Sequence, residues 1–266
     1  MTSIRKKIKK NTPSGPVSGL NFKSNDSIVA LIDVLGFKEM VVKNKAALVQ
    51  RYFNKVIDTQ NGLQQLKGPR LKMALLSDSI ILSYDLKQSR NDALFQMISA
   101  CAKVQRILLT EKILTRGSIS FGSFYMNTNY NVLVGSGLVR SYLSERQAKY
   151  PRIIIDPELI SQFEFKNYSD LASTMNQRGN LISDIEFSTE RTPTSRLEKR
   201  LLFVDYLAYY DPYFELNTNK IETFLSNEIK KTKSEYYEKI EWLSHYFVQS
   251  FPNNSKKLRT LRNTKL

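Results

Sequence analysis

The stretch Ser27-Ile28-Val29-Ala30-Leu31-Ile32-Asp33 decides the fold, because a short apolar run ends on a carboxylate. A run of this length is typical of a buried strand. A second run, from Lys72 to Ser83, has the tetrapeptide Leu76-Ser77-Asp78-Ser79 in its middle, which we predict to be the tip of a hairpin. A carboxylate that ends a buried strand is costly unless it is paired or binds a cation. On neighbouring strands, Asp33 and Asp78 would form an oxygen-ligand site suited to Mg²⁺ or Mn²⁺.

Outward from this pair, the apolar pattern predicts an α+β fold, an α/β sandwich with a ferredoxin-like palm core. The expected elements are a strand at 27–33, helices over 37–66, a hairpin over 71–84, a helix after Asn91 or Asp92, strands at 114–125 and 130–134, a helix from 135 to 149 and a strand at 152–156. The order β-α-α-β-β-α-β-β-α-β predicts a mostly antiparallel sheet with helices covering one face. The signal is weak over 161–199. A further strand over 200–207 and a long helix or helix pair over 219–250 give a C-terminal helical extension.

Positive charge is concentrated at the two ends of the chain. The 266 residues carry a net charge of +15, of which residues 1–25 hold +6 and residues 251–266 hold +5, so the body carries +4. We predict a basic disordered leader at 1–25, a catalytic domain at 26–160, a sheet-completing and helical extension at 161–250 and a basic tail at 251–266. The tails are either solvated arms or contacts to an anionic surface, so nucleic acid is possible but not favoured.

The composition fits a cytoplasmic enzyme. With 41% hydrophobic and 11% aromatic residues, the chain can build a sizeable core. No apolar stretch approaches the length of a membrane span. The single cysteine, Cys101, forms no intramolecular disulfide, and the single histidine, His245, excludes a histidine metal cluster.

Four short motifs occur in the order found in a known enzyme family. Asp33-Val34-Leu35-Gly36-Phe37 resembles the Asp-x-x-Gly-Phe opening of class III nucleotidyl cyclase catalytic domains, and Ser77-Asp78 stands where these cyclases have Gly-Asp. Arg116-x-x-Ile119-x-x-Gly122 resembles their Arg-x-Gly-Ile-x-x-Gly strand. Gly135 to Ala148, followed by Pro151-Arg152-Ile153-Ile154, resembles the closing helix and strand. The resemblance covers about residues 27–157.

The resemblance implies an enzyme that cyclises a nucleoside triphosphate with two metal ions, Mg²⁺ or Mn²⁺. The implied metal ligands are Asp33, Val34 and Asp78, and the implied catalytic residues are Asp33, Asp78 and Arg116. Arg116 would hold phosphate oxygens, a role suited to a bidentate guanidinium. The amides of the Leu35-Gly36-Phe37 turn would bind the β- and γ-phosphates. The family's active site forms at a dimer interface, so the resemblance also implies a homodimer.

Several positions depart from the family pattern. The family's transition-state Asn and Arg fall on Val139 and Leu143, and its purine-selecting lysine falls on Ala74. The base-selecting residue falls near Asn131. The same predicted helix carries four polar residues that are candidates for the transition-state roles, namely Arg140, Glu145, Arg146 and Lys149.

A narrower resemblance concerns the substrate. Five segments together resemble the Pycsar antiphage branch of these cyclases, which makes cyclic pyrimidine mononucleotides: Ile32 to Phe37, Ser77-Asp78-Ser79, Arg116-Gly117, Tyr150-Pro151-Arg152-Ile153 and the late helix from Tyr237 to Leu243. The loss of the purine-reading lysine fits this resemblance. This resemblance implies conversion of UTP or CTP to a 3′,5′-cyclic mononucleotide and pyrophosphate. It also implies a signal in bacterial antiphage defence that activates a separate effector.

Other interpretations stay open. A palm-type cyclic oligonucleotide synthase would use the same two carboxylates, and a nucleotide- or nucleic-acid-binding module that lost catalysis would fit Val139 and Leu143. Each site residue also has a structural alternative. Asp33 could cap the following helix, Asp78 could simply occupy a turn, and Arg116 could belong to a structural ion pair.

Overall fold

The structure is a computed structural model that describes residues 22–67, 70–86, 89–179, 182–183, 201–211, 214–231 and 236–263. Most of the predicted basic leader and the last residues of the tail lie outside these ranges, and the four-part domain division stays a prediction. The first half of the chain contains β1 (Asn25–Val34), α1 (Phe37–Val42), α2 (Ala46–Lys67), β2 (Leu71–Leu76), β3 (Ser79–Asp85), α3 (Arg90–Thr110), β4 (Thr115–Asn127), β5 (Val132–Val134), α4 (Ser136–Glu145) and β6 (Ile153–Ile155). This order is the one predicted.

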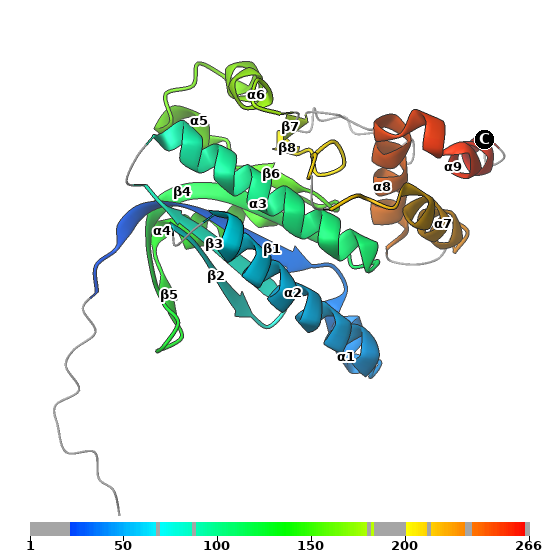
Figure 1. The fold of residues 1–266 in the computed structure, drawn as a ribbon, viewed down its shortest axis with the longest axis horizontal. Helices are drawn as coiled ribbons and strands as arrows, with labels where there is room; N and C mark the ends of the chain where they lie inside the picture. The colour runs from blue at the N-terminus through cyan, green and yellow to red at the C-terminus, as the bar shows by residue number, and fades with distance from the viewer. Residues whose placement is uncertain are drawn as a thin grey trace, which may run out of the picture.

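The second half contains smaller elements. They are α5 (Glu158–Gln162), α6 (Tyr168–Asn176), β7 (Ile182–Ser183), β8 (Phe203–Val204), α7 (Thr218–Ile229), α8 (Tyr237–Ser250), the short 3-10 helix η2 (Pro252–Asn254) and α9 (Lys256–Asn263). In Figure 1, α7, α8 and α9 gather at one end of the molecule. Among the described helices, none is long and apolar enough to cross a membrane.

The sheet confirms the predicted α+β class. Its strands follow the order β2-β3-β1-β4-β6-β8-β7, and β5 pairs with β4. Within this order β4 and β6 are parallel and the other neighbours are antiparallel. The four strands β2-β3-β1-β4, with helices between β1 and β2 and between β3 and β4, form the βαββαβ arrangement of a ferredoxin-like core.

The central strand β1 is buried on both faces. Ile28, Ala30 and Ile32 point into the main core, which is covered by α2 and α3 lying side by side (Figure 1). Val29 points to the other face, where α4 is so close that a Cβ on Gly137 would come within 2.9 Å of Val29 Cγ2. The expectation that helices cover one face is therefore wrong, since α4 covers part of the opposite face.

Two predicted elements end earlier than expected. The helix predicted over 135–149 ends at Glu145, because the chain turns there and Lys149 has a φ of +54°, which a helix does not allow. The strand predicted over 200–207 is reduced to Phe203–Val204. Asp205 Oδ1 accepts a hydrogen bond from the Ala208 amide and starts a turn instead.

The stretch with a weak signal, 161–199, contains the end of α5 and the whole of α6. A signal for α6 was present in Asn167-Tyr168-Ser169-Asp170, because the Asn167 side chain caps this helix by accepting a hydrogen bond from the Asp170 amide at 3.0 Å. The predicted helix pair over 219–250 corresponds to α7 and α8.

Candidate functional site

The register of β1 brings three sequence-predicted residues to one end of the sheet. Asp33 is paired with Ser79 of β3 on one side and with Arg116 of β4 on the other. Asp78 occupies the turn directly before Ser79. The two carboxylates expected on neighbouring strands therefore lie at the same end of the sheet, Asp33 in β1 and Asp78 in the β2–β3 turn, with Arg116 on the strand next to Asp33.

A buried tyrosine of α2 contacts the main chain of the β2–β3 turn. The Tyr52 hydroxyl of α2 donates a hydrogen bond to the main-chain oxygen of Asp78 at 3.2 Å, and Tyr52 is completely buried. Ser77 has a φ of +57°, in the left-handed region that favours glycine. Glycine, which the cyclase motif resembled by Ser77-Asp78 has at this position, would adopt this conformation without strain.

Arg116 lies between two carboxylates. Its Nε is 3.5 Å from Asp33 Oδ2 and 2.5 Å from Glu145 Oε1 of α4. Arg116 therefore forms ion pairs, as the structural alternative for this residue predicts. The capping alternative for Asp33 is wrong, because α1 begins after Gly36 with no side-chain cap.

Burial disfavours the charged forms of the Asp33 and Glu145 carboxylates unless positive charge is nearby. The pKa of Asp33 is raised, first by burial and then by Asp78, while Arg116 opposes the rise. The pKa of Glu145 is raised by burial, which outweighs the lowering by Arg116. One arginine thus does not compensate the buried carboxylates, and a further cation would be stabilised here.

The donor set fits Mg²⁺ or Mn²⁺, since both prefer oxygen ligands. Asp33 and Asp78 would supply carboxylate oxygens, whereas Val34 has a buried apolar side chain and would supply its carbonyl oxygen. Within the described ranges, no group of three or more His, Cys, Asp or Glu residues could hold a metal. Mg²⁺ is often held by one or two carboxylates together with substrate phosphates, so this site would need such a substrate to complete it.

The turn after Asp33 differs from expectation in one respect. The Leu35 amide donates to the Leu114 carbonyl at 2.9 Å, so its predicted contact with a phosphate is wrong; the contacts predicted for the Gly36 and Phe37 amides stay predictions. Gly36 has a φ of +80°, and a Cβ on it would overlap the hydroxyl of Tyr236, just before α8. The close approach that requires glycine is thus made by the C-terminal extension.

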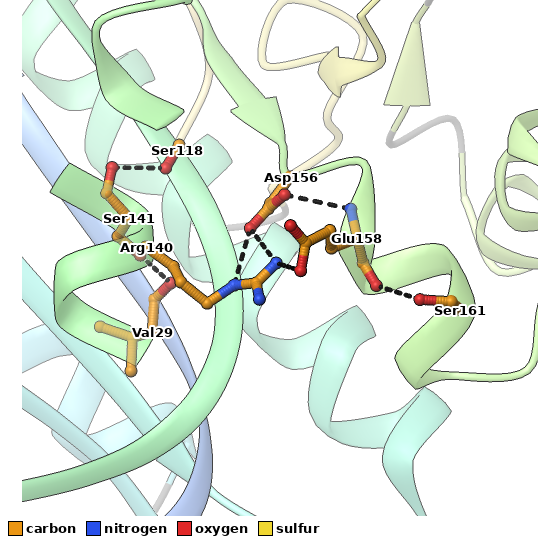
Figure 2. A network of polar contacts seen from close by, with 7 residues as sticks. All are labelled: Val29, Ser118, Arg140, Ser141, Asp156, Glu158 and Ser161. Carbon is orange, nitrogen blue, oxygen red and sulfur yellow. Dashed lines mark hydrogen bonds and ion pairs between the residues drawn. The ribbon is translucent and has the colours of Figure 1, made fainter. Parts of the chain in front are cut away.

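Of the four polar residues considered on the α4 segment, Glu145 reaches Arg116. Arg140 is bound to Asp156 and Glu158 instead (Figure 2). Arg146 donates to the Tyr142 hydroxyl at 2.7 Å. Lys149 is 4.0 Å from a carboxylate oxygen of Glu238 in α8. Sequence reasoning named Glu145 as a candidate but had no signal for its partner.

The two predicted base-reading positions lie apart. Ala74 of β2 is on the same sheet face as Asp33, because it pairs with Ile81, which pairs with Leu31. Asn131 lies in the β4–β5 hairpin, beyond Asn127 at the opposite end of β4 from Arg116. The eleven residue steps from Arg116 to Asn127 span roughly 36 Å of extended strand. Within one chain, the structure does not bring Asn131 to Asp33.

The proteins found to be similar to this chain are solved structures. No protein-family model matches the chain, and no curated protein does either. The guanylyl cyclase Cya2 is similar over 73% of this chain and 98% of its own, with 12% identity and a TM-score of 0.46. The guanylate cyclase domain of RhGC from Catenaria anguillulae in complex with GTP covers 69% and 98%, with 12% identity and a TM-score of 0.46. The adenylyl cyclase CyaB from P. aeruginosa covers 68% and 93%, with 10% identity and a TM-score of 0.44.

Proposed function

We propose that the chain is a metal-dependent nucleotidyl cyclase that converts a nucleoside triphosphate to a 3′,5′-cyclic mononucleotide and pyrophosphate. The observation that carries this proposal is the strand register that places Asp33 between the Asp78 turn and Arg116. The four sequence motifs that resemble class III cyclases include these same residues.

Each residue has a defined task in this reaction. The ribose 3′-hydroxyl attacks the α-phosphorus, the bond from that phosphorus to the oxygen bridging it to the β-phosphate breaks and releases pyrophosphate, and the hydroxyl proton passes to solvent water. Asp33 and Asp78 would hold Mg²⁺ or Mn²⁺, which supplies charge neutralisation and favours loss of the hydroxyl proton. Arg116 binds oxygens of the triphosphate chain, where negative charge collects on the leaving pyrophosphate. Tyr52 keeps the Asp78 turn in place through the main chain.

The preferred base in this proposal is a pyrimidine, from UTP or CTP. Ala74 provides no hydrogen bond where purine cyclases have a lysine. Lys72, two residues earlier on the same face, is 2.9 Å from Asp85 Oδ2 and is already paired. By the resemblance to the Pycsar branch, the cyclic product is a signal in antiphage defence and acts on a separate effector.

The proposed enzyme is a homodimer, because within one chain the predicted base-reading residue Asn131 does not lie near Asp33. On the side of the sheet that carries α4, large apolar side chains are exposed: Val139 at 58%, Leu143 at 57% and Leu76 at 61%. Val139 and Leu143 are four residues apart and share one face of α4, and exposed apolar residues of this kind are expected at an interface. A second copy seated on them could bring its Asn131 hairpin to the first copy's Asp33. The V139E and L143E variants should shift the mass in light scattering to that of a monomer, whereas I57E on exposed α2 should not.

The test of the reaction incubates the protein with each of the four triphosphates and Mn²⁺ or Mg²⁺, followed by mass spectrometry. We expect one cyclic pyrimidine mononucleotide, lost in D78N and kept in D58N, an exposed aspartate on α2. Absence of a cyclic mononucleotide with all four substrates contradicts the proposal. A second candidate, a cyclic oligonucleotide synthase, uses the same two carboxylates and would appear in the same spectra as a product with two or more nucleotides.

A further inference from the structure

The proposed reaction assigns no task to the buried acid Glu145. It lies in the last turn of α4, its side chain is 6% exposed, and its oxygen Oε1 is 2.5 Å from Arg116 Nε. A buried carboxylate is costly even when it is paired, and an apolar side chain of similar size would often be more stable here. Its cost to folding therefore points to a task at the site.

The orientation of α4 is fixed over the sheet by contacts one turn before Glu145. The Ser141 hydroxyl donates to the Val29 carbonyl at 2.8 Å, and the Ser118 hydroxyl donates to the Ser141 carbonyl at 2.8 Å (Figure 2). Arg140, on the neighbouring side of the helix, is bound to Asp156 Oδ2 at 3.2 Å. Since residues four apart share a helix face, Ser141 and Glu145 both face the sheet, and Glu145 is held above Arg116.

The Arg116 atom closest to each of the two carboxylates is Nε. Among the described residues, neither Nη1 nor Nη2 of Arg116 donates a hydrogen bond. The side chain is 28% exposed. A guanidinium held at Nε can present both terminal nitrogens to a ligand, the arrangement that binds two phosphate oxygens at once.

The two carboxylates also compete for the same nitrogen. Arg116 Nε is 1.0 Å closer to Glu145 than to Asp33, at 2.5 Å against 3.5 Å. Glu145 thus draws the guanidinium toward α4 and away from Asp33. If Glu145 lost its charge, the attraction of Asp33 would be unopposed, and Arg116 would close onto the carboxylate that should hold a cation.

We propose that Glu145 is a positioning residue that holds Arg116 off Asp33 and aims its terminal nitrogens at the substrate triphosphate. This inference rests on the proposed function, since it assigns the ligand of Arg116. It predicts that neutralising Glu145 weakens triphosphate binding although Glu145 touches no substrate atom.

The test uses E145Q in the full chain, with E158Q as the matched control. Glu158 is also a carboxylate paired with an arginine, but it lies on Arg140 and is 65% exposed. Calorimetry measures the dissociation constant for 3′-deoxy-UTP and 3′-deoxy-CTP with Mn²⁺, because neither analogue can cyclise. We expect E145Q to weaken binding roughly 10- to 100-fold, as is typical for an outer-shell partner, and E158Q to leave it unchanged.

A second comparison separates positioning from general stability. In an R116A background, E145Q should weaken analogue binding no further, because both changes act through one guanidinium. With substrate, E145Q should raise KM more than it lowers kcat. Unchanged affinity in E145Q, or equal losses in the presence and absence of Arg116, overturns the inference.

Two further outcomes are decisive. If E145Q fails to fold, E145D keeps the charge but withdraws the carboxylate by one methylene, and the same criteria apply to it. If the wild-type protein binds the analogues but yields no cyclic product, the proposed reaction fails while the role of Glu145 is still measured. If the wild-type protein binds neither analogue, the inference fails as well.

Discussion

Replacing Gly36 by alanine should destabilise the protein through two separate effects. The φ of +80° at Gly36 is left-handed, and an alanine there costs about 1–2 kcal/mol. The added Cβ would also overlap the hydroxyl and Cζ of Tyr236 and approach its Cε1 to 3.1 Å. Forcing such an overlap typically costs about 1–3 kcal/mol, so the G36A variant should lose roughly 2–5 kcal/mol of unfolding free energy.

The chain provides a matched control with the opposite sign. Gly62 lies within α2, and a Cβ on it would meet nothing within 4 Å. G62A should therefore stabilise the protein by roughly 0.5–1 kcal/mol, since alanine is a better helix former than glycine. Urea denaturation of the metal-free full chain, monitored by circular dichroism, measures both changes on one scale.

The Tyr236 part of the effect can be isolated with a double-mutant cycle. In a Y236A background the overlap is absent, so G36A should cost only the backbone part of about 1–2 kcal/mol. If G36A costs the same in both backgrounds, the C-terminal extension does not lie on the turn after Asp33, and the reasoning is refuted.

Three other variants test separate parts of the structure. S77G should stabilise the metal-free protein by up to about 1 kcal/mol in urea denaturation, because glycine relieves the φ of +57°; a loss would contradict the left-handed turn. Y246F should destabilise it by roughly 1–3 kcal/mol in the same assay, since the buried hydroxyl donates to Asp205 and accepts from the Leu207 amide; a neutral change would exclude both bonds. D33N should raise the unfolding free energy in EDTA at pH 7 but not near pH 4. Burial and a neighbouring carboxylate raise the pKa of Asp33 in the folded protein, so the contribution of Asp33 to stability is present at low pH and is lost as the pH rises. Equal gains of D33N at both pH values would contradict that sign.

The core of the fold was predictable because its strands have strong local signals. Runs such as 27–33 and 72–83 are apolar, and polar turn residues end or interrupt them. Signals of this kind predict the order of the elements as far as β6. The short elements of the second half were not predictable in this way. β8 has two residues, and its end is set by a side-chain turn at Asp205, which periodicity does not detect.

In the candidate site, too, some residues could be predicted from the sequence and others could not. Asp33 and Asp78 could be identified because a carboxylate at the end of an apolar run is conspicuous in the sequence. The pairing of Arg116 with Glu145 could not, because it depends on how α4 is rotated over β1 and β4. That rotation is set by Ser141 and Ser118, small residues whose spacing carries no chemical signature.

The stacking of α8 on the loop after α4 gives this protein an internal optical probe. Trp242 is its single tryptophan, and its ring lies parallel to that of Tyr150, with centroids 5.5 Å apart and an angle of 3°. The guanidinium of Arg152 lies 5.7 Å from the centroid of the indole ring. Tyr150 follows Glu145 by five residues, so any rearrangement of that acid and its helix on nucleotide binding would be transmitted to the indole. Tryptophan emission should therefore follow events at the site without a label.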